Sequence, residues 1–116
     1  RYRVPNQYRD LAILVARYHT HCHRIAELSP ETVLETLQNL DAFRRPQRFE
    51  QFLLACEADS RGREGLADQP YPQAEQFRQA FEIAKQVDIK AVLADGFKGA
   101  AIGEELRRRR VQALAQ

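Results

Sequence analysis

Several residue types are scarce in this chain of 116 residues, and each scarcity excludes a class of protein. Gly and Pro number five each, which is few for the many turns of a β-sandwich or barrel. Two Cys residues cannot supply the framework of a disulfide-rich secreted domain. No stretch approaches the ~18 consecutive apolar residues of a membrane span. Met is absent, and no signal-peptide pattern is present, so we expect a piece excised from a longer cytoplasmic protein, or alternatively a processed small protein.

The residues that are abundant favour helices, and the sequence predicts an all-α fold of about six helices. Ala, Leu, Glu, Gln and Arg dominate, and 44% of the chain is hydrophobic, enough for a packed core. Pro5, Pro46 and Pro72 each suit the first turn of a helix, and Ser29 followed by Pro30 combines a hydroxyl N-cap with proline at the first helical position. The predicted helices cover residues 5–24, 30–40, 46–59, 72–87, 89–95 and a last segment from about 99 onward, with a loop over 60–70.

Apolar residues recur at steps of three and four within these segments, which predicts the faces that they bury. The third and fourth segments carry the aromatic residues. The two cysteines continue such stripes, so we expect buried, reduced thiols. The predicted core contains Phe49, Phe52, Leu53, Phe77 and Phe81, with Cys22 and Cys56 beside them.

Positive charge is concentrated at the two ends of the chain although the net charge is only +2. Residues 107–110 are four consecutive arginines, and Arg greatly outnumbers Lys in the whole sequence. Guanidinium groups suit bidentate phosphate contacts, but the base composition of a genome produces the same bias. The excess of arginine therefore fits either phosphate binding or genomic base composition.

Three histidines lie within five residues, at His19, His21 and His23. At 100° per residue, His19 and His23 lie 40° apart on one helical face, while His21 points to roughly the opposite side and is expected to face solvent. A pair of histidines at i and i+4 can chelate a transition metal. A structural or exposed pair without a ligand is the alternative.

Asp59 extends the apolar stripe of the third segment by one further step of three. A carboxylate on a buried face must be protonated, paired or bound to a metal. An internal salt bridge to Arg61 or Arg63 and a metal or phosphate site are the two interpretations. We expect Asp59 and His19 to approach each other, since two polar interruptions of apolar faces cost least when they meet.

Five blocks of sequence resemble, in unbroken order, the C-terminal region of the bacterial CCA-adding enzymes. These are tRNA nucleotidyltransferases whose C-terminal part contains an HD-type phosphohydrolase domain. The blocks are His19-x-x-x-His23-Arg24, residues 41–49 (DAFRRPQRF), residues 55–63 (ACEADSRGR), residues 71–74 (YPQA) and residues 96–106 (GFKGAAIGEEL).

The resemblance implies that residues 1–68 form the latter part of an HD-type helical domain and residues 69–116 a C-terminal tail packed on it. The whole protein would complete or repair the CCA end of tRNA with CTP, ATP and Mg²⁺, using a head domain not present in this sequence. Its HD site would hydrolyse 2′,3′-cyclic and 2′ phosphates with a divalent metal such as Ni²⁺. His19, His23 and Asp59 match later metal ligands of that site, but Thr20 stands where many relatives have Asp, and the family's adjacent His-Asp pair is missing.

The predicted partners are the tRNA acceptor arm and, as an option, a second copy of the chain. Arg44, Arg45, Arg61 and Arg63 are the predicted phosphate contacts. With the metal site incomplete, we expect this chain alone to be inactive and to bind no metal tightly. The alternative function is a non-catalytic helical module that binds tRNA or mediates dimerisation, with the basic ends as its electrostatic footprint.

Overall fold

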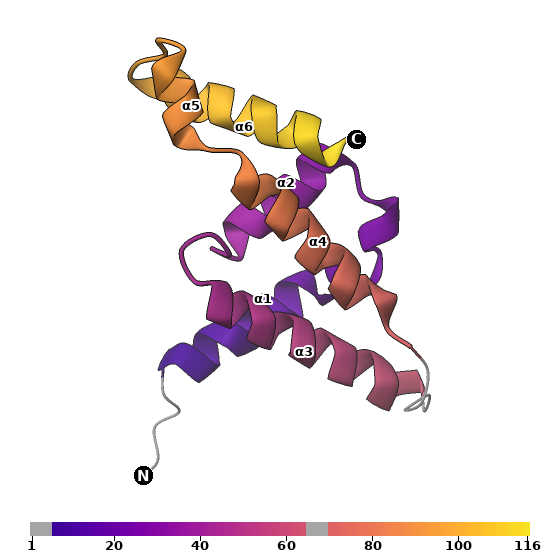
Figure 1. Cartoon of the computed structure of the whole chain (residues 1–116). Helices are drawn as coiled ribbons and strands as arrows, with labels where there is room; N and C mark the ends of the chain where they lie inside the picture. The colour runs from indigo at the N-terminus through magenta and orange to yellow at the C-terminus, as the bar shows by residue number, and fades with distance from the viewer. Residues whose placement is uncertain (1–5, 65–69) are drawn as a thin grey trace.

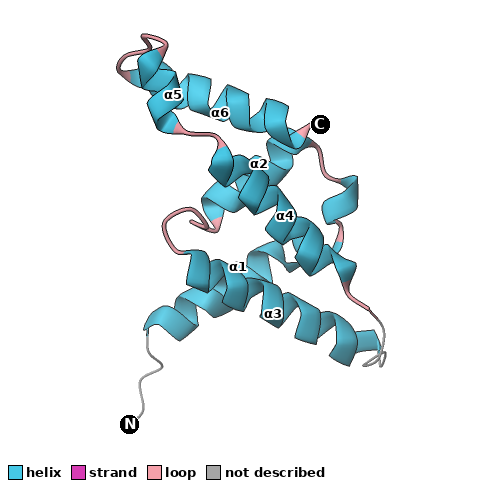
Figure 2. Cartoon of the chain, viewed as in Figure 1, coloured by secondary structure: helices cyan, strands magenta, loops and turns pink. Residues whose placement is uncertain are grey.

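The computed structural model describes residues 6–64 and 70–116, and the regular secondary structure of these residues is helical, with no strand among them (Figure 2), as the sequence predicts. The elements follow one another as α1 (Asn6–His23), the 3₁₀ turn η1 (Ile25–Glu27), α2 (Pro30–Asn39), α3 (Pro46–Glu64), α4 (Pro72–Gln86), α5 (Ile89–Ala94) and α6 (Ala100–Leu114).

The helix ends follow the local signals of the sequence. Ser29 caps α2, where its Oγ accepts a hydrogen bond of 3.2 Å from the backbone N–H of Thr32. Asp88 caps α5 in the same way, through a hydrogen bond of 2.8 Å from the N–H of Lys90. Gly96 ends the α5 region with φ at +93°, a conformation that an L side chain rarely adopts.

Helices α1 and α3 pack across each other at one end of the molecule, and α5 and α6 lie at the other end (Figure 1). Helix α4 runs between these two ends and contacts α1, α2, α3 and α6. The start of α4 therefore reaches the last turn of α1, and its second half reaches α6. The sequence predicts that residues 69–116 are a tail packed on residues 1–68. Within the described residues, helices from these two segments contact each other directly.

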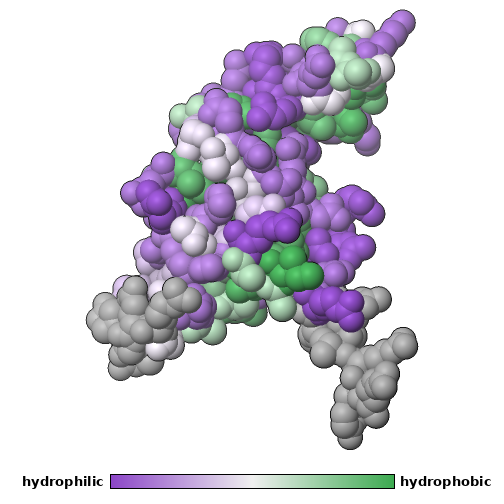
Figure 3. Space-filling model, turned by 180° about the vertical axis from the view of Figure 1, so that it is seen from behind, coloured by the Kyte–Doolittle hydropathy of each residue, from purple (hydrophilic) through white to green (hydrophobic). Residues whose placement is uncertain are grey.

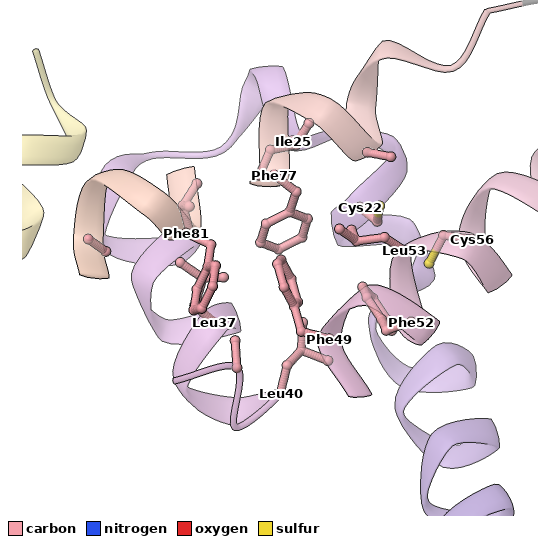
Figure 4. Packing of buried hydrophobic residues seen from close by; sticks show 14 of the residues in the cluster. Cys22, Ile25, Leu37, Leu40, Phe49, Phe52, Leu53, Cys56, Phe77 and Phe81 are labelled. Carbon is pink, nitrogen blue, oxygen red and sulfur yellow. The ribbon is translucent and has the colours of Figure 1, made fainter. Parts of the chain in front are cut away.

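The core lies where α2, α3 and α4 meet, and every residue predicted for it is buried (Figure 4). The ring of Phe49 contacts those of Phe77 and Phe81, with centroids 5.4 and 5.2 Å apart. Phe52 packs edge-on against Phe77 at 6.4 Å. Both Cys22 and Cys56 are free thiols and fully buried, as predicted.

Two local predictions were wrong. The predicted loop over 60–70 begins later, because α3 continues to Glu64; an ion pair of 2.8 Å between Arg61 and Glu57, one turn apart, supports this added turn. His21 does not face solvent fully: it is half-buried, its Nδ1 is buried, and its ring packs edge-on against Tyr18 at 5.6 Å.

The turn between α2 and α3 contains an unusual backbone conformation. Asp41 has φ at +57°, the only positive φ of a non-glycine residue in the described chain. The N–H of Asp41 donates to the carbonyl of Gln38 at 3.0 Å, and the N–H of Ala42 donates to the carbonyl of Leu37 at 3.1 Å. This is a Schellman motif, in which glycine normally occupies the position held here by Asp41.

Among the side chains that the structure describes, large apolar ones are exposed at a few sites: Ile13, Leu54, Ile83, Ile89 and Leu93. From behind, green apolar areas are limited in extent and most of the visible surface is hydrophilic (Figure 3). Within the described ranges, no helix has both the length and the apolar composition needed to traverse a bilayer.

Candidate functional site

The predicted metal ligands lie where α1, α3 and the start of α4 meet. His23 ends α1, and Asp59 lies in the second half of α3. The Nε2 of His23 is 3.3 Å from the Oδ2 of Asp59, and its Nδ1 is 2.7 Å from the hydroxyl of Tyr71. Both His23 and Asp59 are partly exposed, at 25% and 32% of their side-chain surface. The structure thus joins His23 and Asp59, two of the three predicted ligands.

Hydrogen bonds occupy both ring nitrogens of His23. The Asp59 carboxylate accepts, so Nε2 carries the proton in this assignment, and Nδ1 then accepts from the Tyr71 hydroxyl. The same hydroxyl is 3.4 Å from the Cys22 sulfur, but it has one hydrogen, and the shorter contact at 2.7 Å is with His23. Binding of a metal ion by His23 would therefore break one of these two hydrogen bonds.

His19 is arranged differently. Its Nδ1 donates to the carbonyl of Val15, one turn back, at 2.9 Å. That bond leaves the lone pair on Nε2 and fixes the ring, which is the usual arrangement of a metal-binding histidine. The side chains of His19 and Asp59 line the same surface hollow of about 450 Å³ between α1 and α3. That His19 and Asp59 approach each other closely stays a prediction, which their position in one hollow favours.

Behind His23, the polar contacts continue into the core. The neighbouring Cys22 thiol, together with burial, raises the pKa of Cys56 well above its ordinary value. Burial and the contact with Cys22 also raise the pKa of Tyr71. A thiol and a phenol held in their neutral forms are not nucleophiles at neutral pH. These groups act as structural links between α1, α3 and α4.

The sequence block YPQA attaches α4 to the end of α1. Besides the Tyr71 hydroxyl, the side-chain amide of Gln73 donates to the backbone carbonyl of His23 at 3.3 Å. Carbonyls in the last turn of a helix lack an intrahelical partner, so this bond caps α1. Ala74, at 2% exposure, packs into the core directly behind.

As arranged here, the residues do not make a metal site by themselves. Within the described residues there is no group of three His, Cys, Asp or Glu side chains that could hold a metal ion. His19 offers one nitrogen with a suitable tautomer, whereas His23 is engaged on both sides. A metal held by His19 would need further ligands from residues that this part of the chain does not provide.

The predicted phosphate contacts differ in their surroundings. Arg44 and Arg45 are exposed in the turn before α3, each 3.7 Å from the carboxylate of Asp41. Arg61 is paired with Glu57 on its own helix and not with Asp59. The side chain of Arg63 lies outside the described residues. Among the predicted contacts whose side chains are described, Arg44 and Arg45 lie together.

The arginine run in α6 is largely used within the protein. Arg108 and Arg109 both bind the carboxylate of Glu105, and hydrogen bonds from Arg108 and then Arg109 lower the pKa of Glu105 to about 2. Arg110 donates to the carbonyl of Ala84 at 3.0 Å, and its guanidinium lies 4.4 Å from the centre of the Phe43 ring. Three of the four charges therefore have intramolecular partners, which weakens their interpretation as an electrostatic footprint.

Tyr71 and Arg48 have roles that sequence reasoning missed. Tyr71 precedes a helix start, and nothing local indicates that its hydroxyl meets a histidine 48 residues away. Arg48 belongs to the same basic block as Arg44 and Arg45, and its Nη2 donates to the carbonyl of Leu40 at 3.1 Å. Its position in the first turn of α3, close to those two arginines, was an available signal.

The chain is similar over its whole length to proteins described as "Multifunctional CCA protein". It is 58% identical over 116 residues to that of Thioalkalivibrio sulfidiphilus, covering 100% of this chain and 28% of the relative. It is 55% identical over 114 residues to that of Actinobacillus pleuropneumoniae serotype 5b, covering 98% and 28%, and 54% identical over 116 residues to that of Nitrosococcus oceani, covering 100% and 29%. The chain thus spans less than a third of the length of these relatives. No family model matches the chain. No solved structure matches it either.

Proposed function

Because the chain is closely related, residue for residue, to a segment of the multifunctional CCA proteins, we propose that it is a helical part of a CCA-adding tRNA nucleotidyltransferase. The whole protein would add or repair the CCA end of tRNA, using CTP and ATP with Mg²⁺ in a head domain. The observation that carries the proposal is the 58% identity across all 116 residues. The tRNA acceptor arm is the proposed partner, and the cytoplasm the proposed compartment.

For the chain itself, the proposed role is to present a rigid helical surface to the rest of the enzyme and to tRNA. The contacts of Tyr71 and Gln73 with His23 join α1 to α4, so the segments predicted as HD-type part and tail form one body. A non-catalytic contribution of this kind is supported by the engagement of His23 on both ring nitrogens.

Hydrolysis of 2′,3′-cyclic and 2′ phosphates at an HD-type site remains part of the proposal for the whole protein. Imidazole and carboxylate donors suit a divalent metal such as Ni²⁺, and the tautomer of His19 supports a ligand role for its Nε2. The described residues do not complete such a site, so its other ligands would come from elsewhere in the protein.

A chimera tests the proposal. The matching segment of the Thioalkalivibrio sulfidiphilus protein is replaced by these 116 residues, and CCA addition to a tRNA that lacks its CCA end is measured. We expect the chimera to be active and a protein with the segment deleted to lose activity. A chimera that shows a cooperative thermal unfolding transition but adds no nucleotides contradicts the proposal.

A further inference from the structure

A basic hollow of about 530 Å³ lies where the α2–α3 turn enters α3. We refer to it as the arginine hollow. None of its lining side chains, all of which are described, is acidic or aromatic. They are Arg44, Arg45, Pro46, Gln47, Arg48 and Gln51.

The guanidinium groups of this hollow retain unused hydrogen-bond donors. Arg44 and Arg45 approach Asp41 only to 3.7 Å, beyond hydrogen-bond distance, so the carboxylate orients them without occupying their N–H groups. Arg48 uses one N–H, from Nη2 to the carbonyl of Leu40 at 3.1 Å. Its Nε is buried and has no hydrogen-bond partner within the described chain. Two of the three arginines thus lie near one carboxylate, that of Asp41, and Arg48 adds a third positive charge to the hollow.

The turn that carries these arginines is held from both sides. Ala42 is fully buried beneath it. The ring of Phe43 lies between Phe81, at 5.4 Å, and the guanidinium of Arg110, at 4.4 Å. Two apolar residues packed against the core, Ala42 and Phe43, therefore directly precede the exposed Arg44 and Arg45. A binding group held this way loses little conformational entropy when a ligand arrives.

The position of the hollow at the start of α3 adds to its positive potential. This helix has 19 residues, and Pro46 begins it. The N–H groups of Gln47 and Arg48 lie in the first turn, where no intrahelical acceptor is available. The helix dipole favours an anion at this end. The arginine side chains and the backbone N–H groups at the start of α3 therefore both favour an anion in the hollow.

We propose that the arginine hollow binds a phosphate group of an RNA backbone. Forked guanidinium donors match phosphate oxygens, and arginine is preferred at such contacts. A mononucleotide or a single-stranded base normally also needs an aromatic face for stacking, and the lining offers none. The assignment of RNA rests on the proposed function, in which tRNA is the partner; the preference for phosphate rests on the hollow alone.

Binding of labelled tRNA to the 116-residue chain, measured by fluorescence anisotropy over a range of salt concentrations, tests this site. We expect Arg44→Ala combined with Arg45→Ala to weaken binding about tenfold at low salt and to reduce the slope of log affinity against log salt by about 1.5 to 2. The pair Arg44→Lys and Arg45→Lys should recover most of the affinity. The control, Lys90→Ala with Lys98→Ala, removes the same charge from exposed positions elsewhere and should change affinity less than about twofold.

Three results would overturn the assignment: no tRNA binding by the unaltered chain, equal weakening by the two alanine pairs, or ATP binding that the Arg44 and Arg45 substitutions abolish while tRNA binding is unchanged. The last would assign the hollow to a free nucleotide or phosphate. The chimera experiment is independent: an active chimera with equal weakening by the two alanine pairs rejects the arginine hollow and leaves the proposed function standing.

Discussion

The hydroxyl of Tyr71 and the Nδ1 of His23 lie 2.7 Å apart although 48 residues separate them in the chain. This contact joins Tyr71, the residue directly before α4, to His23, the last residue of α1. The amide of Gln73 adds a second bond, to the carbonyl of the same histidine. Two side chains from one short block thus hold His23 by its ring and by its backbone.

Tyr71→Phe should destabilise the fold. It removes the hydroxyl, so the partly buried Nδ1 of His23 loses its partner, which typically costs about 1–2 kcal/mol. Urea unfolding followed by circular dichroism measures the difference. Tyr18→Phe is the matched control, since the described residues give its hydroxyl no hydrogen bond and its ring contact with His21 is retained. Equal stability of the two variants would contradict the structural role of Tyr71.

Phe49→Ala should be among the most damaging substitutions. The ring is 1% exposed and contacts Phe77 and Phe81, so its loss leaves a cavity at the centre of the core. We expect a cost of about 3–5 kcal/mol in the free energy of unfolding. Leu54→Ala, on the same helix at 58% exposure, should stay within about 0.5 kcal/mol of the unaltered chain. A small effect at Phe49 would mean that the core packs differently.

The sequence was sufficient to predict the helices and the core because those signals are local. Prolines at Pro30, Pro46 and Pro72 begin helices, and the apolar steps through Phe49 and Phe52 identify the buried face. The added turn from Ser60 to Glu64 was missed because glycine and polar residues there resemble a loop. Its stability comes from helix continuation and the pair between Arg61 and Glu57.

The site was predicted only in part, because its geometry depends on contacts between distant segments. The family resemblance assigns His19, His23 and Asp59 to one site, and the structure joins His23 to Asp59. Helical spacing alone predicts that His19 is the residue that meets Asp59. Neither signal indicates that Tyr71 occupies the second nitrogen of His23. Likewise, a run of arginines gives no sign that Arg110 packs on Phe43. Pairings of this kind follow from the packing of α4 and α6.

Asp41 should be less favourable for stability than glycine at its position. Its φ of +57° is strained for a residue with a Cβ, and the Schellman motif favours glycine there. Comparing Asp41→Gly with Asp41→Ala isolates the backbone effect, because both variants lack the carboxylate. We expect the glycine variant to be more stable by about 1 kcal/mol in urea unfolding. Equal stabilities would show that the backbone relaxes out of the left-handed region.

Glu105 should contribute to stability at neutral pH and lose that contribution in acid. Hydrogen bonds from Arg108 and Arg109 lower its pKa from 4.5 to about 2 in the folded chain. Since the folded pKa lies below the unfolded one, the contribution is complete above about pH 4.5 and is lost as pH falls toward 2. Glu105→Gln should therefore flatten the pH dependence of the urea midpoint in that window. Glu104→Gln removes a neighbouring exposed carboxylate and should leave the pH dependence of the urea midpoint between pH 2 and 4.5 unchanged.

Ni²⁺ in excess should neither raise the melting temperature of the 116-residue chain nor produce hydrolysis of 2′,3′-cyclic AMP. The Nε2 of His19 is the one histidine nitrogen of the His19–His23 pair left free by the hydrogen bonds, and a second histidine ligand from that pair would require breaking a bond of His23 to Asp59 or Tyr71. An ion bound at 100 times its dissociation constant would stabilise the chain by about 2.7 kcal/mol, a readily measured shift. His21→Ala serves as the control for incidental imidazole binding. A melting temperature raised by Ni²⁺ in the unaltered and His21→Ala chains, but not in His19→Ala, would show that the chain binds the metal without help from other residues.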